Sequence, residues 1–345
     1  MKLTVINDTH LGVSRQTGTT PESQKALTEF MKQQFLDLLN RANNSDLLIN
    51  GDLFDKSDVD KSIEFFVFRH LQNWCVNNPN KTLFLAAGNH DESKSSDVIS
   101  SFHNLASYLE ASISNVKIIS KKYEEIYPGI FVIPHMMNQD LFSQELAEVL
   151  KQSPKYVFLH ANYDNKFAAQ TDHSLNVSGD LALEFAKAGT TLVFAHEHKK
   201  RQIGNVHIVG NQIVSSIADC LGDDTKQYVV LDDTGLQYVT YQQIADCFAE
   251  IDWTASEIPE KHFLRISGEA DQSEAAATIS TLKNIRQKSE AFVVTNSIRI
   301  KSLSNEKLAE VDDVKKYDVK ELVASRLPES LKPRFEEVVA LKEDN

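Results

Sequence analysis

The sequence of 345 residues has little cysteine and no long apolar run. Its three cysteines, Cys75, Cys220 and Cys247, are scattered and show no CxxC spacing. This pattern excludes a disulfide framework and a zinc knuckle, and it indicates reduced thiols. No apolar segment approaches the roughly 18 residues that a membrane span needs. The first residues, MKLTVINDTH, become polar too soon for a signal peptide. We therefore expect a cytoplasmic protein with no membrane association.

Positive charge is also scarce. Lysine and arginine total 36 against 49 aspartates and glutamates, which gives a net charge of −13. Such a chain repels phosphate at long range, so free-standing binding to nucleic acid would need metal ions or a basic partner that reverse the sign locally. The rest of the composition, 41% hydrophobic and 25% charged, is typical of a globular protein. The length favours two domains, or one large domain with an appendage.

Short apolar runs alternate with helical patterns over the first two thirds of the chain, which predicts a layered α/β fold. Six runs have the length and composition of buried strands: 3–7, 46–50, 82–87, 130–134, 156–160 and 191–195. Apolar residues at helical spacing predict helices over 23–42 and 62–74. A later segment predicts a hairpin with its turn at Asp232–Gly235, so the sheets are expected to be mixed.

The character of the sequence changes near residue 244. Two strand-like segments, 261–268 and 291–302, flank a helical pattern that opens at Asp271, the expected N-cap, with Glu274 three residues later. We therefore predict a large domain over 1–243 and a small α/β domain over 244–302. The last segment, 303–345, has few strong hydrophobes and predicts helices that need a partner to be stable.

Five of the predicted strands end in residues that bind metal ions. The motifs are DTH, GDLFD, GNHD, a single histidine and HEH, which contain Asp8, His10, Asp52, Asn89, His90, Asp91, His160, His196 and His198. Open α/β sheets bind ligands beyond the carboxyl ends of their strands. Carboxylate, amide oxygen and neutral imidazole are ligands of hard or borderline divalent ions. The strand ends therefore predict a metal site.

The spacing of these residues fits two ions. Asp8 and His10 are two apart on extended chain, so both side chains point to the same side and can hold one ion. His196 and His198 have the same spacing and can each serve a different ion. Asp52 has two oxygens and can bridge both ions. Two ions about 3.5–4 Å apart activate a water and hold a phosphoryl group, so a phosphoesterase site is predicted.

The motifs DTH, GDLFD, GNHD, H and AHEH resemble those of the calcineurin-like metallophosphoesterase superfamily over residues 1–243. One position departs from the pattern, because Ala195 stands where the family usually has glycine. The resemblance implies a layered α/β/β/α sandwich with mixed sheets. It implies a first metal held by Asp8, His10, Asp52 and His198. It implies a second metal held by Asp52, Asn89, His160 and His196.

The same resemblance implies roles for two residues of GNHD. His90 would contact the phosphate and protonate the departing oxygen, and Asp91 would orient His90. Basic residues near the motifs are candidates for contacts with a substrate backbone: Arg15, Lys199, Lys200 and Arg201. For the run of three, a solvated strand start is the alternative.

Within the superfamily, DTHLG, GDLFD and GNHD are most similar to SbcD-type nucleases, the bacterial and phage counterparts of the eukaryotic meiotic-recombination nuclease. This resemblance implies a DNA exonuclease or endonuclease of a recombination or repair complex. Manganese is the ion it implies, and the ligands would also accept magnesium, iron or zinc. A phage origin fits the resemblance, and the location would then be the host cytoplasm.

The resemblance to SbcD-type nucleases also implies partners. A coiled-coil SbcC-type ATPase would bind the segment 303–345, and the small domain at 244–302 would cap the nuclease domain. A homodimer contact is implied near Phe65, Phe66 and Phe68, for which a helix buried on two sides is the alternative. Two other functions stay open. A small-molecule phosphodiesterase or phosphatase would suit the net acidity, and a scaffold subunit for the ATPase would not need the complete ligand set.

Overall fold

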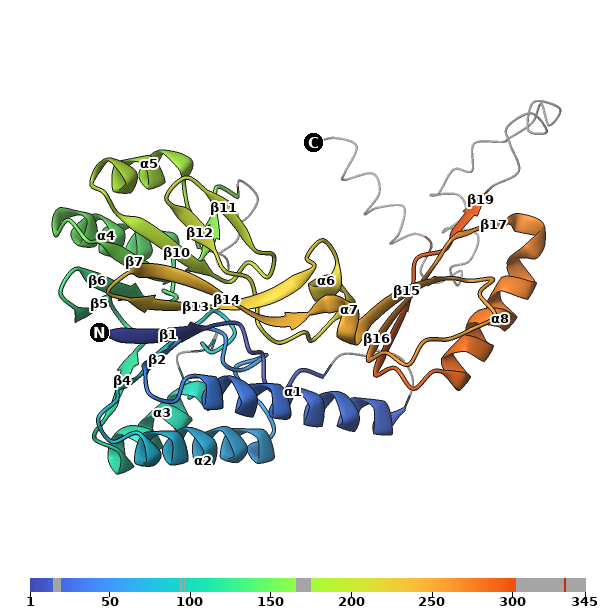
Figure 1. Ribbon diagram of the computed structural model, residues 1–345, viewed down its shortest axis with the longest axis horizontal. Helices are drawn as coiled ribbons and strands as arrows, with labels where there is room; N and C mark the ends of the chain where they lie inside the picture. The colour runs from blue at the N-terminus through green and yellow to red at the C-terminus, as the bar shows by residue number, and fades with distance from the viewer. Residues whose placement is uncertain (15–19, 94, 96, 166–174, 302–331, 333–345) are drawn as a thin grey trace. The chain divides into compact units, whose positions relative to one another are not determined.

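The computed structural model describes residues 1–14, 20–93, 95, 97–165, 175–301 and 332 (Figure 1). Its first mixed sheet has the order β14-β13-β1-β2-β3-β4. Four neighbouring strands of this sheet are parallel: β1 (Lys2–Ile6), β2 (Asp46–Asn50), β3 (Leu83–Ala86) and β4 (Val116–Ile119). The antiparallel strands β13 (Thr225–Asp232) and β14 (Gly235–Gln243) extend it beyond β1 and form the predicted hairpin.

The second mixed sheet has the order β11-β12-β10-β7-β6-β5. Its parallel strands are β6 (Ile130–Ile133), β7 (Tyr156–His160), β10 (Thr191–Ala195) and β12 (Val206–Ile208). The antiparallel edge strands are β5 (Glu124–Tyr127) and β11 (Arg201–Ile203). A short parallel pair, β8 (Asn162–Tyr163) and β9 (Asn176–Val177), follows β7.

The two sheets pack against each other and are covered by helices on their outer faces (Figure 1). One buried cluster lies between the sheets and includes Val5 and Phe84 from the first and Phe158 and Val193 from the second. The first sheet is covered by α1 (Pro21–Arg41), α2 (Lys61–Asn77) and α3 (Ser101–Ser112). The second is covered by α4 (Gln139–Lys151) and α5 (Gly179–Lys187). The predicted α/β/β/α sandwich is thus confirmed.

Local sequence explains why α1 begins where it does. The side chain of Thr20 accepts a hydrogen bond from the backbone N–H of Ser23 at 3.2 Å, and Pro21 occupies the first turn, where no backbone donor is needed. Leu27, Met31 and Phe35 then recur at helical spacing and are buried against the first sheet. The helix therefore has a capped start and one apolar face.

The small α/β unit contains the predicted strand–helix–strand arrangement and a strand that the sequence did not reveal. Its parallel sheet has the order β15-β16-β18, formed by β15 (Phe248–Asp252), β16 (Phe263–Ser267) and β18 (Val293–Asn296). Helix α8 (Ala275–Lys288) follows a 3₁₀ turn, Gln272–Glu274. The backbone N–H of Asp271 donates to Glu274 at 3.1 Å, as a capping box requires. A separate parallel pair consists of β17 (Glu269–Asp271) and β19 (Arg299–Lys301).

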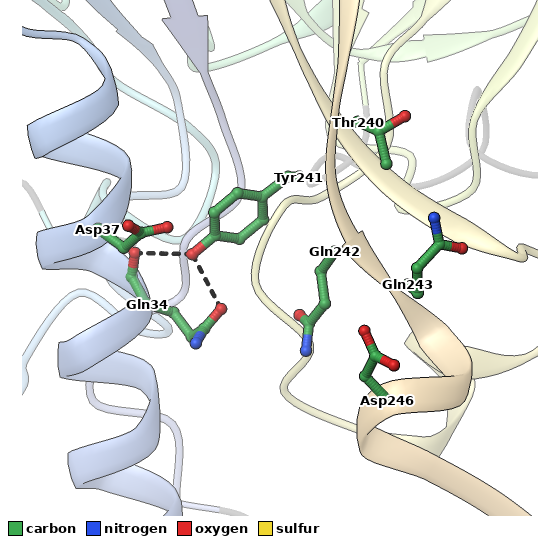
Figure 2. A pocket seen from close by; sticks show the side chains of 7 residues that line it. All are labelled: Gln34, Asp37, Thr240, Tyr241, Gln242, Gln243 and Asp246. Carbon is green, nitrogen blue, oxygen red and sulfur yellow. Dashed lines mark hydrogen bonds between the residues drawn. The ribbon is translucent and has the colours of Figure 1, made fainter.

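Helix α1 also contacts strand β14 and two residues beside the small sheet. The Tyr241 hydroxyl lies 3.0 Å from the carbonyl oxygen of Gln34 and 2.8 Å from its Oε1, at the wall of a pocket between α1 and β14 (Figure 2). The Phe30 ring contacts the rings of His262 and Phe292 at centroid distances of 4.9 and 5.8 Å. These contacts join the small sheet to the large domain.

The chain divides into two compact units. One unit comprises Met1–Gly268 and Ser280–Ser297, and Glu269–Ile279 and β19 belong to a second unit. The boundaries at 243 and 302 therefore stay predictions. The predicted tail, 303–345, lies outside the described residues except for Lys332. Among the described helices, none combines the length and hydrophobicity that crossing a lipid bilayer requires.

Candidate metal centre

The predicted ligands meet at the carboxyl ends of strands from both sheets. Asp8 and His10 follow β1, and Asp52 follows β2. The strand ends are linked beyond the sheet, because the N–H of Asp8 donates to the carbonyl of Gly51 and the N–H of His10 donates to that of Asp52, both at 3.0 Å. His160 ends β7, which lies in the other sheet. Residues far apart in sequence are thereby brought to one place.

Four of the predicted ligands have left-handed backbone conformations. The φ angles are 50° at Asp8, 45° at His10, 50° at Asp52 and 82° at His196. Residues other than glycine rarely adopt positive φ, and each such residue costs on the order of 1 kcal/mol or more. The surrounding sheet contacts hold this strained backbone in place. Strain of this kind persists where a site requires its side chains in one orientation.

One group of ligands contains Asp8, His10 and His198, whose ligand atoms lie within 4.8 Å of one another. The Nε2 atoms of His10 and His198 are 3.1 Å apart. Asp52 is close by, since its Oδ2 lies 3.7 Å from Nε2 of His10. This arrangement corresponds to the first predicted metal set.

A second group contains Asp52, His160 and His196. Oδ1 of Asn89 lies 3.0 Å from Nε2 of His160 and 2.8 Å from Nδ1 of His196. The Oδ2 atom of Asp52 that faces His10 also lies 3.3 Å from Nε2 of His160. A single carboxylate oxygen therefore stands between the two groups, where a bridging ligand belongs.

The hydrogen bonds of His160 show that the donor set fits a cation. Its Nδ1 lies 3.2 Å from the carbonyl oxygen of Asn50, which can only accept, so Nδ1 carries the proton. Its Nε2 then faces two oxygens, those of Asn89 and Asp52. Atoms that converge in this way require a positive charge between them, either a proton on Nε2 or a metal ion. Oxygen and imidazole ligands in this combination suit divalent metal ions.

The acid–base properties of the site point the same way. Burial opposes a charged His160, but the carboxylates of Asp52 and Asp8 prevail and raise its pKa to about 9. Burial also opposes ionisation of Asp52, and His160 and His10 nevertheless hold its pKa well below the usual range. Burial and the neighbouring His160 lower the pKa of His196 to about 4, which favours the neutral imidazole that a metal ligand must be.

Asp219 contacts a predicted metal ligand and was not predicted from the sequence. Its Oδ1 lies 2.7 Å from Nδ1 of His198, and its Oδ2 accepts hydrogen bonds from the backbone and hydroxyl groups of Ser215 and Ser216 at 2.9–3.0 Å. It lies in α6 (Ile217–Cys220) and is 2% exposed. A carboxylate bound to one ring nitrogen directs the other toward the metal. No motif links Asp219 to His198, so only the fold brings them together.

Asp219→Asn is expected to weaken binding of one metal ion about tenfold or more, because the amide cannot hold His198 with a negative charge. The measurement is the metal concentration that gives half-maximal hydrolysis of bis(p-nitrophenyl) phosphate. Asp180→Asn, an exposed carboxylate on α5, serves as the matched control. An unchanged metal requirement in Asp219→Asn would remove the orienting role.

His90 is held by a different group from the one expected. Nδ1 of His90 lies 2.5 Å from the carbonyl oxygen of Asp55. The fully buried carboxylate of Asp91 accepts hydrogen bonds from the backbone N–H groups of Leu53, Phe54 and Gly88 at 3.2, 3.0 and 2.9 Å. Within the described residues, Asp91 therefore fixes the loops after β2 and β3, and Asp55 makes the contact that was predicted for Asp91. The catalytic role of His90 stays a prediction.

Two of the four basic residues predicted as substrate contacts have partners within the chain. Nζ of Lys200 lies 2.9 Å from the carbonyl oxygen of Thr225, and Arg201 pairs with Glu197 at 2.7 Å. Lys199 is exposed, with its side chain beside Gly222. Arg15 lies outside the described residues. The described contacts thus favour structural roles for Lys200 and Arg201 over contacts with a substrate backbone.

The sandwich and its two ligand groups define a metal-dependent phosphoesterase. Residues 1–238 match the Metallophos family, calcineurin-like phosphoesterase. The chain therefore belongs to this family, whose members bind two divalent metal ions, and the His/Asp groups fit such ions.

The crystal structure of TT1561 of Thermus thermophilus is similar at 12% sequence identity and a TM-score of 0.42, covering 70% of this chain and 99% of that one. A comparison with curated proteins gives no match.

Proposed function

We propose that the chain is a two-metal-dependent DNA phosphodiesterase, an exonuclease or endonuclease subunit of an SbcCD-like recombination or repair complex. The observation that carries the phosphodiesterase part is the oxygen of Asp52 that lies 3.7 Å from His10 and 3.3 Å from His160, between two ligand groups. The DNA part is supported by the motifs DTHLG, GDLFD and GNHD and by the small α/β unit after β14. A small substrate would need no such unit.

The first ion would be held by Asp8, His10, Asp52 and His198, and the second by Asp52, Asn89, His160 and His196. Manganese is the proposed ion. Bound ions would supply Lewis-acid stabilisation of the phosphoryl group and an activated water. His90 would act as the acid that protonates the leaving group. With Nδ1 held by Asp55, its Nε2 is the nitrogen left to give a proton to the departing 3′ oxygen as the P–O bond breaks.

The test is hydrolysis of end-labelled linear DNA by the full chain in Mn²⁺, with bis(p-nitrophenyl) phosphate as a parallel substrate. We expect EDTA to abolish cleavage and His90→Ala to lower the rate on DNA about 10²-fold or more, because a general acid contributes at least that much. His207→Ala, on β12, is the matched control. Copurification with a coiled-coil ATPase tests the assignment to a complex.

Other outcomes would select the alternatives. Hydrolysis of the aryl diester without DNA cleavage, with or without the ATPase, would favour a small-molecule phosphodiesterase. Hydrolysis of neither substrate in Mn²⁺ would favour the scaffold function. An undiminished rate in His90→Ala would contradict the proposed proton donor even if DNA is cleaved.

We also propose that the chain forms a homodimer through α2 and α3. Phe65 is 63% exposed, which supports a contact here over a helix buried on two sides. Val76, three helical turns later, is 62% exposed, and Tyr108 on α3 is 53% exposed. The Phe68 ring contacts Tyr108 at a centroid distance of 6.0 Å, which places apolar side chains of α2 and α3 next to each other. An apolar patch of this kind suits a contact between two copies.

Phe65→Glu is expected to convert the dimer to a monomer, because a charge at the centre of an apolar contact is costly to bury. The measurement is sedimentation equilibrium of the purified chain. Leu183→Glu, at a residue of α5 that is 59% exposed, is the control and should leave the dimer intact. A wild-type chain that sediments as a monomer at micromolar concentration contradicts the proposal.

A further inference from the structure

A cleft of about 720 Å³ opens beside His90. Its walls come from three loops that follow the carboxyl ends of β2, β3 and β6, and they include Lys56, Asn89, His135 and Met137. Among the described residues, Asn89 is the one predicted metal ligand that lines the cleft. The cleft therefore adjoins the metal centre on the side of the proton donor.

The position of His90 decides which part of a substrate this cleft can hold. This step rests on the proposed function, in which His90 protonates the departing 3′ oxygen. The nucleoside that carries this oxygen must then extend from the phosphate past His90. The cleft lined by His90 is a space that can receive it.

The walls of the cleft are held in place before any substrate arrives. The carbonyl oxygen of Ser57 accepts a hydrogen bond from the N–H of Ser101 at 2.7 Å, and the N–H of Val59 donates to the Ser101 hydroxyl at 3.2 Å. These bonds fix the loop after β2 on α3. The N–H of His135 donates to the carbonyl of Ala87 at 2.8 Å, which fixes the loop after β6 against the end of β3. Fixed walls reduce the entropy lost on binding.

Two side chains of the lining suit a nucleotide. Lys56 is exposed and offers an ammonium group, a common ligand of phosphate. Met137 is 83% exposed, and its flexible thioether packs well against aromatic rings. The carboxylates of the lining have partners of their own. Glu92 lies 3.7 Å from Nε2 of His103, and Asp55 lies 3.5 Å from Nδ1 of His10. Burial raises the pKa of Glu92 to about 7, which reduces its repulsion of a phosphate.

We infer that this cleft binds the leaving-side nucleotide of a polynucleotide, with Met137 against its base and Lys56 on the phosphate at its 5′ side. In the reaction, water adds to phosphorus, the P–O3′ bond breaks, and the 3′ oxygen takes the proton of His90. The leaving nucleotide is thus released from the cleft with a free 3′ hydroxyl. A substrate that carries a 5′ phosphate on this nucleotide gains one ion pair over a substrate that lacks it.

The experiment compares the dinucleotides dTpdT and pdTpdT, which differ by that 5′ phosphate alone. We expect the full chain in Mn²⁺ to cleave pdTpdT with a KM about fivefold lower and a similar kcat, the size of effect that one solvent-accessible ion pair gives. Lys56→Ala should remove this difference. Lys187→Ala on α5 should keep it. Met137→Ala is the second variant. It should raise KM for dTpdT more than KM for a dTpdT analogue that lacks the base of its 5′ nucleoside, because Met137 is proposed to contact that base.

The outcomes separate the inference from the proposed function. Equal KM values for the two dinucleotides in the wild type, or a fivefold difference that survives in Lys56→Ala, would overturn the inference while DNA cleavage stands. Hydrolysis of bis(p-nitrophenyl) phosphate without cleavage of either dinucleotide would overturn both. Loss of the difference in Lys56→Ala, with the difference kept in Lys187→Ala, supports the inference.

Discussion

Asp52→Asn is expected to lower the hydrolysis of bis(p-nitrophenyl) phosphate about 10³-fold or more and to leave fewer than two ions bound. The carboxylate is 1% exposed, and its Oδ2 faces His10 and His160 at 3.7 and 3.3 Å. An amide of the same shape keeps the packing but removes the negative charge that both ions would share. Loss of several kcal/mol of transition-state stabilisation corresponds to this change in rate.

Bound metal is measured by mass spectrometry after gel filtration, in parallel with the rate at saturating Mn²⁺. Asp233→Asn is the matched control, because this carboxylate is 86% exposed in the turn between β13 and β14. Two ions bound to Asp52→Asn would contradict the bridging position. A rate close to that of the wild type would contradict the two-metal site itself.

The strand ends explain why the candidate site was largely predictable from the sequence. Each ligand ends a short apolar run or follows it within a few residues, and parallel strands of one sheet end at the same edge. Asp8, Asp52 and Asn89 are therefore close together as soon as β1, β2 and β3 pair. His160 and His196 are joined to them by the packing of the second sheet on the first. Pattern and topology point to the same residues.

The contacts between ligands and their supports were not predictable in the same way. Asp219 is separated from His198 by 21 residues and reaches it only because α6 begins beside the site. The three hydrogen bonds that Asp91 accepts from backbone N–H groups depend on how the loops after β2 and β3 pack. The partners of Lys200 and Arg201 are likewise set by tertiary structure. Such contacts have no periodicity or spacing that a sequence displays.

In the small unit, the sequence predicted the helix and its flanking strands but missed β15. The segment Phe248–Asp252 is five residues long, has no fully buried residue and lacks a long apolar run, so its strand signal is weak. It becomes a strand through parallel pairing with β16. Tertiary pairing thus decides where local propensity is weak.

Gly88→Ala is expected to abolish turnover and to lower the free energy of unfolding by about 3 kcal/mol. A Cβ at Gly88 would lie 2.2 Å from both the backbone nitrogen and Oδ1 of Asp52. The N–H of Gly88 also donates to Asp91 at 2.9 Å, and both carboxylates are buried, so neither side can move away without disturbing the ligands. Overpacking of a buried site typically costs about 1–3 kcal/mol. The displaced Asp52 would in addition lose its position between the two metal groups.

Denaturant unfolding and metal content together test this expectation. Gly179→Ala is the control, since a Cβ there would meet only the carboxylate of Asp164 at 3.7 Å, an ordinary contact. A Gly88→Ala protein that is destabilised but still binds two ions and turns over would show that the clash is relieved away from Asp52. Loss of both metal and stability would show that position 88 needs a glycine, because a side chain there would occupy the space of the Asp52 carboxylate.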